Sequence, residues 1–226
     1  MIGQKCSVEG CVRDAKTRGL CWTHDFSQRY QTDTKFRESR NKTKRDYNQR
    51  YLQTYRDVIA EGLGGWKCVF CGVADRDVLS FDHKDGGGEN ERNRMAGQLP
   101  TIRYYYHNSG EAKERLQVLC ANCTWKKNAS RYGLGRSRTA VWQRRARIAL
   151  IDLLGGRKCG VCGLRDMEVL TIDHVNGGGT RERKVMKGYP PMIWYYSAHP
   201  EAAQRNLQVL CRNCNWKRYK SRSRSA

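Results

Sequence analysis

The sequence predicts an α+β fold made of small modules: two tandem units with one shared order of elements, and a shorter module before them. Residues 64–127 align with residues 155–218 without a gap, and half of the aligned positions are identical, so a unit has been duplicated. Only 38% of the 226 residues are hydrophobic, which leaves little material for one large core. The chain also has 11 cysteines, and small modules commonly depend on such residues for cross-links or metal sites.

Each copy shows the same order of predicted elements. A helix is expected at residues 46–61 before the first copy and at residues 139–154 before the second, and a glycine pair ends each helix. In the first copy a short strand follows over residues 78–83, then three glycines, and then a second strand with the sequence Leu-Gln-Val-Leu. Basic helical sequence beginning near Trp125 ends the unit, and equivalent segments occur in the second copy. The aromatic insert between the strands is not assigned to an element.

Two Cys-x-x-Cys pairs occur in each copy at identical spacing. One pair precedes the first strand and the other follows the second strand, an arrangement typical of a structural zinc site. The alternatives are four reduced, buried cysteines or a redox-active pair, and the recurrence of both pairs favours zinc. The expected ligands are Cys68, Cys71, Cys120 and Cys123 in the first copy, and Cys159, Cys162, Cys211 and Cys214 in the second.

A third set of zinc ligands is predicted near the N-terminus, formed by Cys6, Cys11, Cys21 and His24. The spacing of this set is irregular and no repeat supports it. The prediction depends on the number of cysteines, because the three sets together use all of them. We therefore expect three zinc ions and three domains. These are a zinc knuckle at residues 1–40, a first unit at residues 41–133, and a second unit with a basic C-terminal tail at residues 134–226.

The charge of the chain predicts a polyanionic partner. It has 43 Lys and Arg against 22 Asp and Glu, a formal net charge of +21. No segment approaches the roughly 18 apolar residues that a membrane-spanning helix needs, and the chain opens with polar sequence. We therefore expect a soluble intracellular protein that binds nucleic acid and not membranes. Basic runs are often only solvated surfaces, but here two flank the units: the tail at residues 217–224, and linker residues Lys126, Lys127, Arg131, Arg136, Arg138, Arg144, Arg145 and Arg147.

An Asp-His pair ends the first predicted strand of each copy, as Asp82-His83 and Asp173-His174, with three glycines shortly after. Glycine there lets a backbone or a phosphate approach closely. Phosphodiester hydrolysis needs a general base and a divalent cation, and an aspartate beside a histidine supplies a hard oxygen ligand and a base. Two further histidines do not align across the repeat and are interpreted as structural, namely His107 and His199.

The order Cys-x-x-Cys, Asp-His and Cys-x-x-Cys-Asn resembles the HNH, or ββα-metal, endonuclease family, and in particular its phage endonuclease VII-like members. The resemblance covers residues 64–127 and 155–218 and implies two tandem ββα-metal units. In that family the histidine activates water, while the acidic residue before it and a later His or Asn hold a divalent metal. Carried over, it makes His174 the base, Asp173 and Asn215 the ligands of Mg²⁺ or Mn²⁺, and Asn206 the residue that steadies the loop of the base.

The first copy departs from this pattern at two positions. Asn206 aligns with Arg115, and Asn215 aligns with Thr124, although Asp82-His83 remains. A threonine hydroxyl is a poorer ligand for a hard cation than an amide oxygen, and an arginine brings positive charge near a cation site. We therefore expect the first copy to keep its zinc and fold but to lose much or all of its catalysis. The alternative is that both copies cut.

Three functions compete on these observations. The leading one is an endonuclease that nicks or cuts double-stranded or branched DNA, with no small-molecule substrate. The others are a non-catalytic nucleic-acid-binding protein that retains the fold, for example an RNA binder, and a plain zinc-finger regulator. The resemblance implies a location in the cytoplasm or nucleoid of a bacterial host, and a phage origin. A further hypothesis is that the two copies pair as an intramolecular pseudo-dimer.

Overall fold

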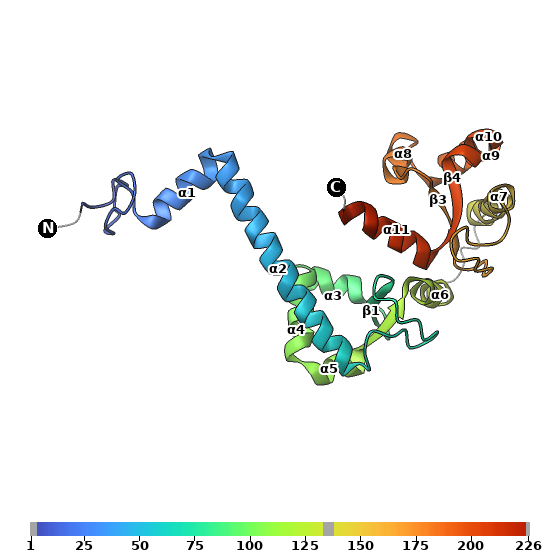
Figure 1. Ribbon diagram of the computed structural model, residues 1–226, viewed down its shortest axis with the longest axis horizontal. Helices are drawn as coiled ribbons and strands as arrows, with labels where there is room; N and C mark the ends of the chain where they lie inside the picture. The colour runs from blue at the N-terminus through green and yellow to red at the C-terminus, as the bar shows by residue number, and fades with distance from the viewer. Residues whose placement is uncertain (1–3, 133–137, 225–226) are drawn as a thin grey trace.

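The computed structural model describes residues 4–132 and 138–224 (Figure 1). Helices predominate, and two separate sheets each contain two antiparallel strands, which confirms the predicted α+β class. Within the described residues, no helix is both long enough and apolar enough to cross a membrane. Three predicted features lie outside the described part of the chain: the domain boundary at residues 133 and 134, Arg136 of the basic linker, and the side chain of Arg131 in the same linker.

The N-terminal cysteine segment stands apart from the rest of the chain on a long helix. Helix α1 (Trp22–Thr32) folds back on the start of α2 (Thr34–Gly62), a helix of 29 residues. The turn between them is fixed by Asp33, whose carboxylate accepts a hydrogen bond from the Phe36 N–H at 2.9 Å. Helix α2 runs without a break through residues 40 and 41 and carries the knuckle at its far end (Figure 1).

The two copies have the same succession of elements: a leading helix, a strand, three short helices, a second strand and a final helix. After α2, the first copy contains β1 (Leu79–His83), α3 (Gly88–Arg94), α4 (Gln98–His107), α5 (Ser109–Arg115), β2 (Leu116–Cys120) and α6 (Ala121–Tyr132). The second contains α7 (Arg138–Leu153), β3 (Leu170–His174), α8 (Gly179–Val185), α9 (Tyr189–Ala198), α10 (Pro200–Asn206), β4 (Leu207–Cys211) and α11 (Arg212–Arg224).

Local sequence accounts for the ends of these elements. The Gly64-Gly65 pair follows α2 with φ of 94° and 93°, in the left-handed region where glycine carries no Cβ penalty, and this confirms the predicted helix stop. The predicted strands are confirmed as β1, β2, β3 and β4. The aromatic insert, which the sequence left unassigned, forms α4 and α9; each buries one tyrosine almost completely, Tyr105 or Tyr196.

Each copy has two small apolar clusters instead of one large core. One cluster surrounds the cysteines and the inner faces of the strands, where Val118 and Leu119 are completely buried. The other lies between the leading helix and the aromatic helix, and in the second copy it joins Leu150 to Ile193. The Asp-His strand borders both clusters, so its end is held in place from two sides.

The two copies contact each other through the starts of α6 and α11, and the contacts are reciprocal. The Asn122 backbone N–H donates to Asn213 Oδ1 at 2.9 Å, and the Asn213 N–H donates to Asn122 Oδ1 at 3.0 Å. Each asparagine thereby satisfies an N–H at the start of the other helix. Equivalent ion pairs flank them, Lys126 with Asp166 and Lys217 with Asp75, both at 2.5 Å. Residues that pair with their own repeat equivalents mark a pseudo-two-fold axis, as in a symmetric dimer.

Candidate functional site

The three predicted sets of cysteine and histidine side chains each come together. Within each set the ligand atoms all lie within 4.8 Å of one another. Sulfur atoms of Cys71 and Cys120 are 3.7 Å apart, and the equivalent pair in the second copy is 3.8 Å apart. That is far longer than a disulfide bond of about 2.05 Å, and it matches the separation of about 3.8 Å between two sulfurs bound at about 2.3 Å to one tetrahedral zinc. The three sets can therefore hold metal ions such as zinc.

The local backbone favours the thiolate form at one cysteine of each copy. Burial raises the pKa of Cys68, but hydrogen bonds from backbone N–H groups outweigh it and bring the pKa down to about 7. The same balance brings the pKa of Cys159 to about 7. Burial and neighbouring thiols raise the pKa of Cys123 instead, because adjacent thiolates repel each other. A divalent cation among the four sulfurs would remove that repulsion.

Both Asp-His pairs lie at the end of the first strand of their sheet. In the second copy Asp173 is in register with Gln208, and His174 with Leu207. Gln208 donates from Nε2 to Asp173 Oδ2 at 3.1 Å, which orients the carboxylate. The first copy repeats this contact between Gln117 and Asp82 at the same distance.

A glutamate and a tyrosine complete a hydrogen-bonded chain behind each histidine. In the second copy His174 Nε2 contacts the Glu182 carboxylate, and the Tyr196 hydroxyl donates to Glu182 Oε1 at 2.8 Å. The equivalent chain in the first copy consists of His83, Glu91 and Tyr105. These glutamates and tyrosines were not predicted as functional residues, although both positions are identical between the copies and could have been identified from that identity.

The hydrogen bonds from His174 to Glu182 and from Tyr196 to Glu182 determine which ring nitrogen of His174 is basic. A carboxylate accepts hydrogen bonds, so the neutral imidazole carries its proton on Nε2 and leaves Nδ1 to take up another. Burial and the Glu182 carboxylate raise the pKa of Tyr196 to about 12, so its hydroxyl remains a donor. The second copy thus contains an imidazole with a defined tautomer and a fixed orientation.

The third glycine of each triplet makes room for the histidine ring. A Cβ atom on Gly179 would lie 2.5 Å from His174 Nδ1, and Gly88 is equally close to His83. Any larger residue would displace the ring. The sequence predicted that these glycines admit a backbone or a phosphate; at this position, the structure gives the more specific reason that the imidazole packs against the glycine backbone.

A groove of about 810 Å³ runs over the second copy's Asp-His pair. Asp173, His174 and Asn215 all line it, so three of the four residues predicted for this copy share one groove. Asn206, the fourth, lines an adjoining hollow that His174 also lines. The Asn206 carbonyl accepts a hydrogen bond from the Val175 N–H at 2.8 Å, which ties down the chain directly after the histidine.

Arginines dominate the lining of this groove, and Asp173 is the one carboxylate among the described residues that line it. Arg222 donates to the Val175 carbonyl at 2.8 Å, a bond that orients the guanidinium without cancelling its charge. The arginines of the groove are Arg144, Arg147, Arg183, Arg212 and Arg222. A surface of this kind is suited to several phosphates in succession.

In the first copy a lysine is paired with the aspartate of the equivalent site. Lys127 forms a close ion pair with Asp82 and also donates to the His83 carbonyl, and both members of the pair are largely buried. The second copy has Arg218 at the aligned position. Its Nε stands 3.7 Å from Asp173 Oδ2, a looser approach than that of Lys127.

The two predicted departures of the first copy also have structural consequences. Arg115, which stands in place of Asn206, binds Glu91 Oε1 at 2.9 Å. Thr124, which stands in place of Asn215, has a buried hydroxyl that finds no hydrogen-bond partner within the described chain. The first copy therefore keeps the Asp-His pair but surrounds it with different groups.

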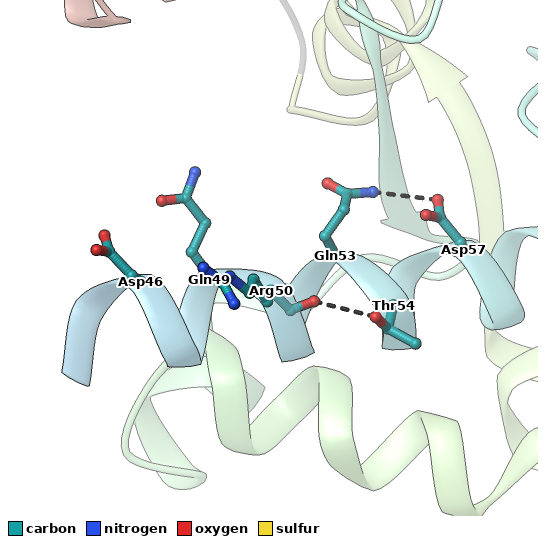
Figure 2. A pocket seen from close by; sticks show the side chains of 6 residues that line it. All are labelled: Asp46, Gln49, Arg50, Gln53, Thr54 and Asp57. Carbon is teal, nitrogen blue, oxygen red and sulfur yellow. Dashed lines mark hydrogen bonds between the residues drawn. The ribbon is translucent and has the colours of Figure 1, made fainter. Parts of the chain in front are cut away.

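A separate hollow lies along α2 and holds none of the predicted site residues (Figure 2). Within the helix, Gln53 Nε2 donates to Asp57 Oδ1 at 3.1 Å, and the Thr54 hydroxyl donates to the Arg50 carbonyl at 3.1 Å. Asp57 also accepts a hydrogen bond from Trp66 Nε1 at 2.8 Å and forms an ion pair with Arg76. Its chemistry is that of an ordinary polar helix surface. An equivalent groove lies over Asp82 and His83 in the first copy. His107 and His199 lie outside the lining of both grooves and contact neighbouring tyrosine rings.

No protein-family model, curated protein or solved structure matches this chain. We therefore infer function from the residues and the geometry of the second-copy groove.

Proposed function

We propose that the chain is a metal-dependent HNH endonuclease that hydrolyses phosphodiester bonds in DNA and nicks through its second copy. The observation that carries this proposal is the shared groove, where Asp173, His174 and Asn215 lie among five arginines. Arginine side chains suit phosphate oxygens, and the formal charge of +21 favours a polyanion. The groove thus combines a base, two hard oxygen donors and a phosphate-binding wall.

The Asp173 carboxylate and the Asn215 amide oxygen would hold the Mg²⁺ or Mn²⁺ ion. Both are hard oxygen donors, and both line the same groove. Within the described chain, the contacts of Gln208 and Arg218 with Asp173 are both made to Oδ2, which leaves Oδ1 as the oxygen that would bind the cation. When bound between these residues, a divalent ion would supply charge stabilisation to the phosphate.

His174 acts as the general base in this proposal. It takes a proton from the attacking water at Nδ1, while Glu182 stabilises the resulting imidazolium through Nε2 and Tyr196 holds Glu182 in place. The water oxygen bonds to phosphorus as the bond to the leaving sugar oxygen breaks, and the leaving oxygen takes up a proton from solvent. The products are a phosphate monoester on one side of the nick and a hydroxyl on the other.

The first copy contributes little or no cleavage in this account. Lys127 neutralises Asp82, the residue that would bind the metal, and Thr124 supplies no amide oxygen. His83 keeps its contact with Glu91, so the base alone is retained. A base without a cation on the phosphate lacks the larger part of the needed charge stabilisation.

The second candidate is a non-catalytic nucleic-acid-binding protein, such as an RNA binder, that retains the HNH arrangement. The observation that favours it is that a basic side chain approaches the aspartate in both copies, Lys127 closely and Arg218 at 3.7 Å. In that case the grooves bind phosphates and cut nothing.

A plasmid assay distinguishes the two functions. Purified protein is incubated with supercoiled plasmid and magnesium or manganese, with EDTA as the control and excess magnesium added back afterwards. An endonuclease converts supercoiled DNA to nicked circle only when the metal is present. Retardation of the plasmid on the gel without any nicked product in either metal supports the non-catalytic binder instead.

A further inference from the structure

The groove of the second copy includes a residue from the first. Trp125 lies on α6, yet it lines the groove that holds Asp173 and His174. On the other side of the pseudo-two-fold axis Trp216, on α11, lines the groove over the first copy's Asp-His pair. The two tryptophans are repeat equivalents, so each copy supplies an indole to the other copy's groove.

Trp125 is held in position by the second copy, and Trp216 is not held in the same way by the first. The guanidinium of Arg212 lies 3.7 Å from the centre of a Trp125 ring. The position equivalent to Arg212 is Ala121, and Trp216 instead packs on Tyr219 of its own helix, with ring centres 5.7 Å apart. Lys220 of the same helix places its Nζ 5.8 Å from the centre of a Trp216 ring. Trp125 nevertheless remains 37% exposed, so an indole braced by a cation still presents surface to the groove.

We propose that Trp125 contacts the substrate of the second copy and stacks on an unpaired base of the strand that is cut. This inference builds on the proposed function, because it names a part of the substrate bound in the same groove. The arginines of the groove bind phosphates, while an indole beside them offers a flat apolar face. Nucleobases have flat faces of matching size, and stacking of one base on an aromatic side chain typically increases affinity about 5- to 150-fold.

The contact selects among nucleic acids. Inside a continuous duplex both faces of every base are covered by neighbouring base pairs, so no face is available to an indole. A base in a single-stranded segment exposes its faces to stacking. The groove therefore favours a strand with an unpaired segment at the site over a fully paired duplex, and the first copy retains a role in substrate binding after the loss of its own site residues.

A binding comparison in the His174→Ala background tests this without cleavage and without removing zinc. The probes are a duplex with an internal unpaired segment and its fully paired counterpart, each with 2-aminopurine at the same position. We expect the protein to bind the unpaired probe more tightly and to quench its fluorescence. Trp125→Ala should lose about 5- to 150-fold in affinity for the unpaired probe, with little change for the paired one. Trp125→Phe should retain most of the affinity.

Trp216→Ala is the matched control, because it removes the equivalent indole from the groove of the first copy. With His174 present, Trp125→Ala should reduce kcat/KM on the unpaired substrate by the same factor as its affinity, and Trp216→Ala should leave it unchanged. Equal losses on both probes, or equal losses from the two tryptophan variants, would show that Trp125 serves only the contact between the copies. If the wild-type protein nicks nothing, the proposed function fails, and the two probes still decide whether Trp125 stacks on a base.

Discussion

Arg115 places its guanidinium 2.9 Å from Glu91, the carboxylate that also binds His83 and Tyr105. The second copy has Asn206 at this position, and no arginine is inserted there. The Glu91 side chain is 4% exposed, whereas its equivalent Glu182 is 26% exposed. The same set of His, Glu and Tyr hydrogen bonds is thus centred on a buried glutamate in the first copy and on a partly exposed glutamate in the second.

The first prediction concerns acid stability of the first copy. Burial raises the pKa of Glu91, but hydrogen bonds from Tyr105 and His83, with the charge of Arg115, outweigh burial and lower it. A lowered folded-state pKa means that the carboxylate stabilises the fold at pH above its unfolded value of about 4.3. This stabilisation is lost as the pH falls through the lowered folded-state pKa.

Glu91→Gln should therefore reduce the free energy of unfolding by about 1–3 kcal/mol at neutral pH, because Arg115 loses its charged partner and one of the two acceptor oxygens is replaced by an NH2 donor. Its stability should also depend less on pH below about 5 than that of the wild type. Denaturant unfolding at several pH values measures both. Glu89→Gln, an exposed change on the same helix, is the control and should cost less than about 0.5 kcal/mol. Equal effects of the two variants would contradict the account.

The second prediction separates positioning of the base from substrate binding. Glu182→Gln preserves the size of the side chain but cannot stabilise an imidazolium, so kcat for nicking should fall about 10- to 100-fold. KM and Kd for DNA should stay the same, since Glu182 acts through His174. Glu182→Asp should recover part of the rate, and Glu91→Gln should leave it unchanged. A rise in KM with no change in kcat would make Glu182 a binding residue instead.

The third prediction is that the folded chain carries three zinc ions. Metal analysis after desalting should give three per chain, and Cys21→Ser should give two while both copies remain folded. Cys211→Ser should unfold the second copy, because binding free energy at such a site is also folding free energy. Limited proteolysis reports which part is lost. A content of two in the wild-type chain would remove the N-terminal site.

The fourth prediction concerns phosphate contacts in the groove. Affinity for DNA should fall steeply with salt, and Arg144→Gln should reduce the slope of log K against log salt by about 0.9. Arg144 lines the second-copy groove, while the exposed Arg103 on α4 does not. Arg103→Gln is thus the control and should leave the slope unchanged. An affinity independent of salt would mean that the groove does not follow the phosphate backbone.

Much of the fold follows from the sequence because a repeated pattern is strong evidence. The cysteine sets were predictable because their spacing recurs in both copies. The strands were predictable because each is a short apolar run, either Leu-Gln-Val-Leu or the run that ends in Asp-His. The aromatic insert was not predictable, since a short apolar run fits a strand or a helix equally well. Its helical state depends on packing against α2 or α7, which is a tertiary effect.

The candidate site also contains residues that were predictable from the sequence and residues that were not. Asp173, His174 and Asn215 could be selected from residue type and order, whereas Glu182 lies on a separate helix and is brought to the histidine by the fold. Contacts between the copies, such as Asn122 with Asn213, depend on how two complete units dock. The spacing of residues within one unit does not predict which residues meet between the two units.

The most direct test of the central claim compares His174→Ala with His83→Ala in the nicking of supercoiled plasmid. His174→Ala should reduce the rate about 10²- to 10⁴-fold, as expected for loss of a general base, with fold and DNA binding unchanged. His83→Ala should change the rate little, and nicked circle should accumulate before any linear DNA. Equal losses from the two variants, or linear product without a nicked intermediate, would contradict the assignment of cleavage to the second copy alone.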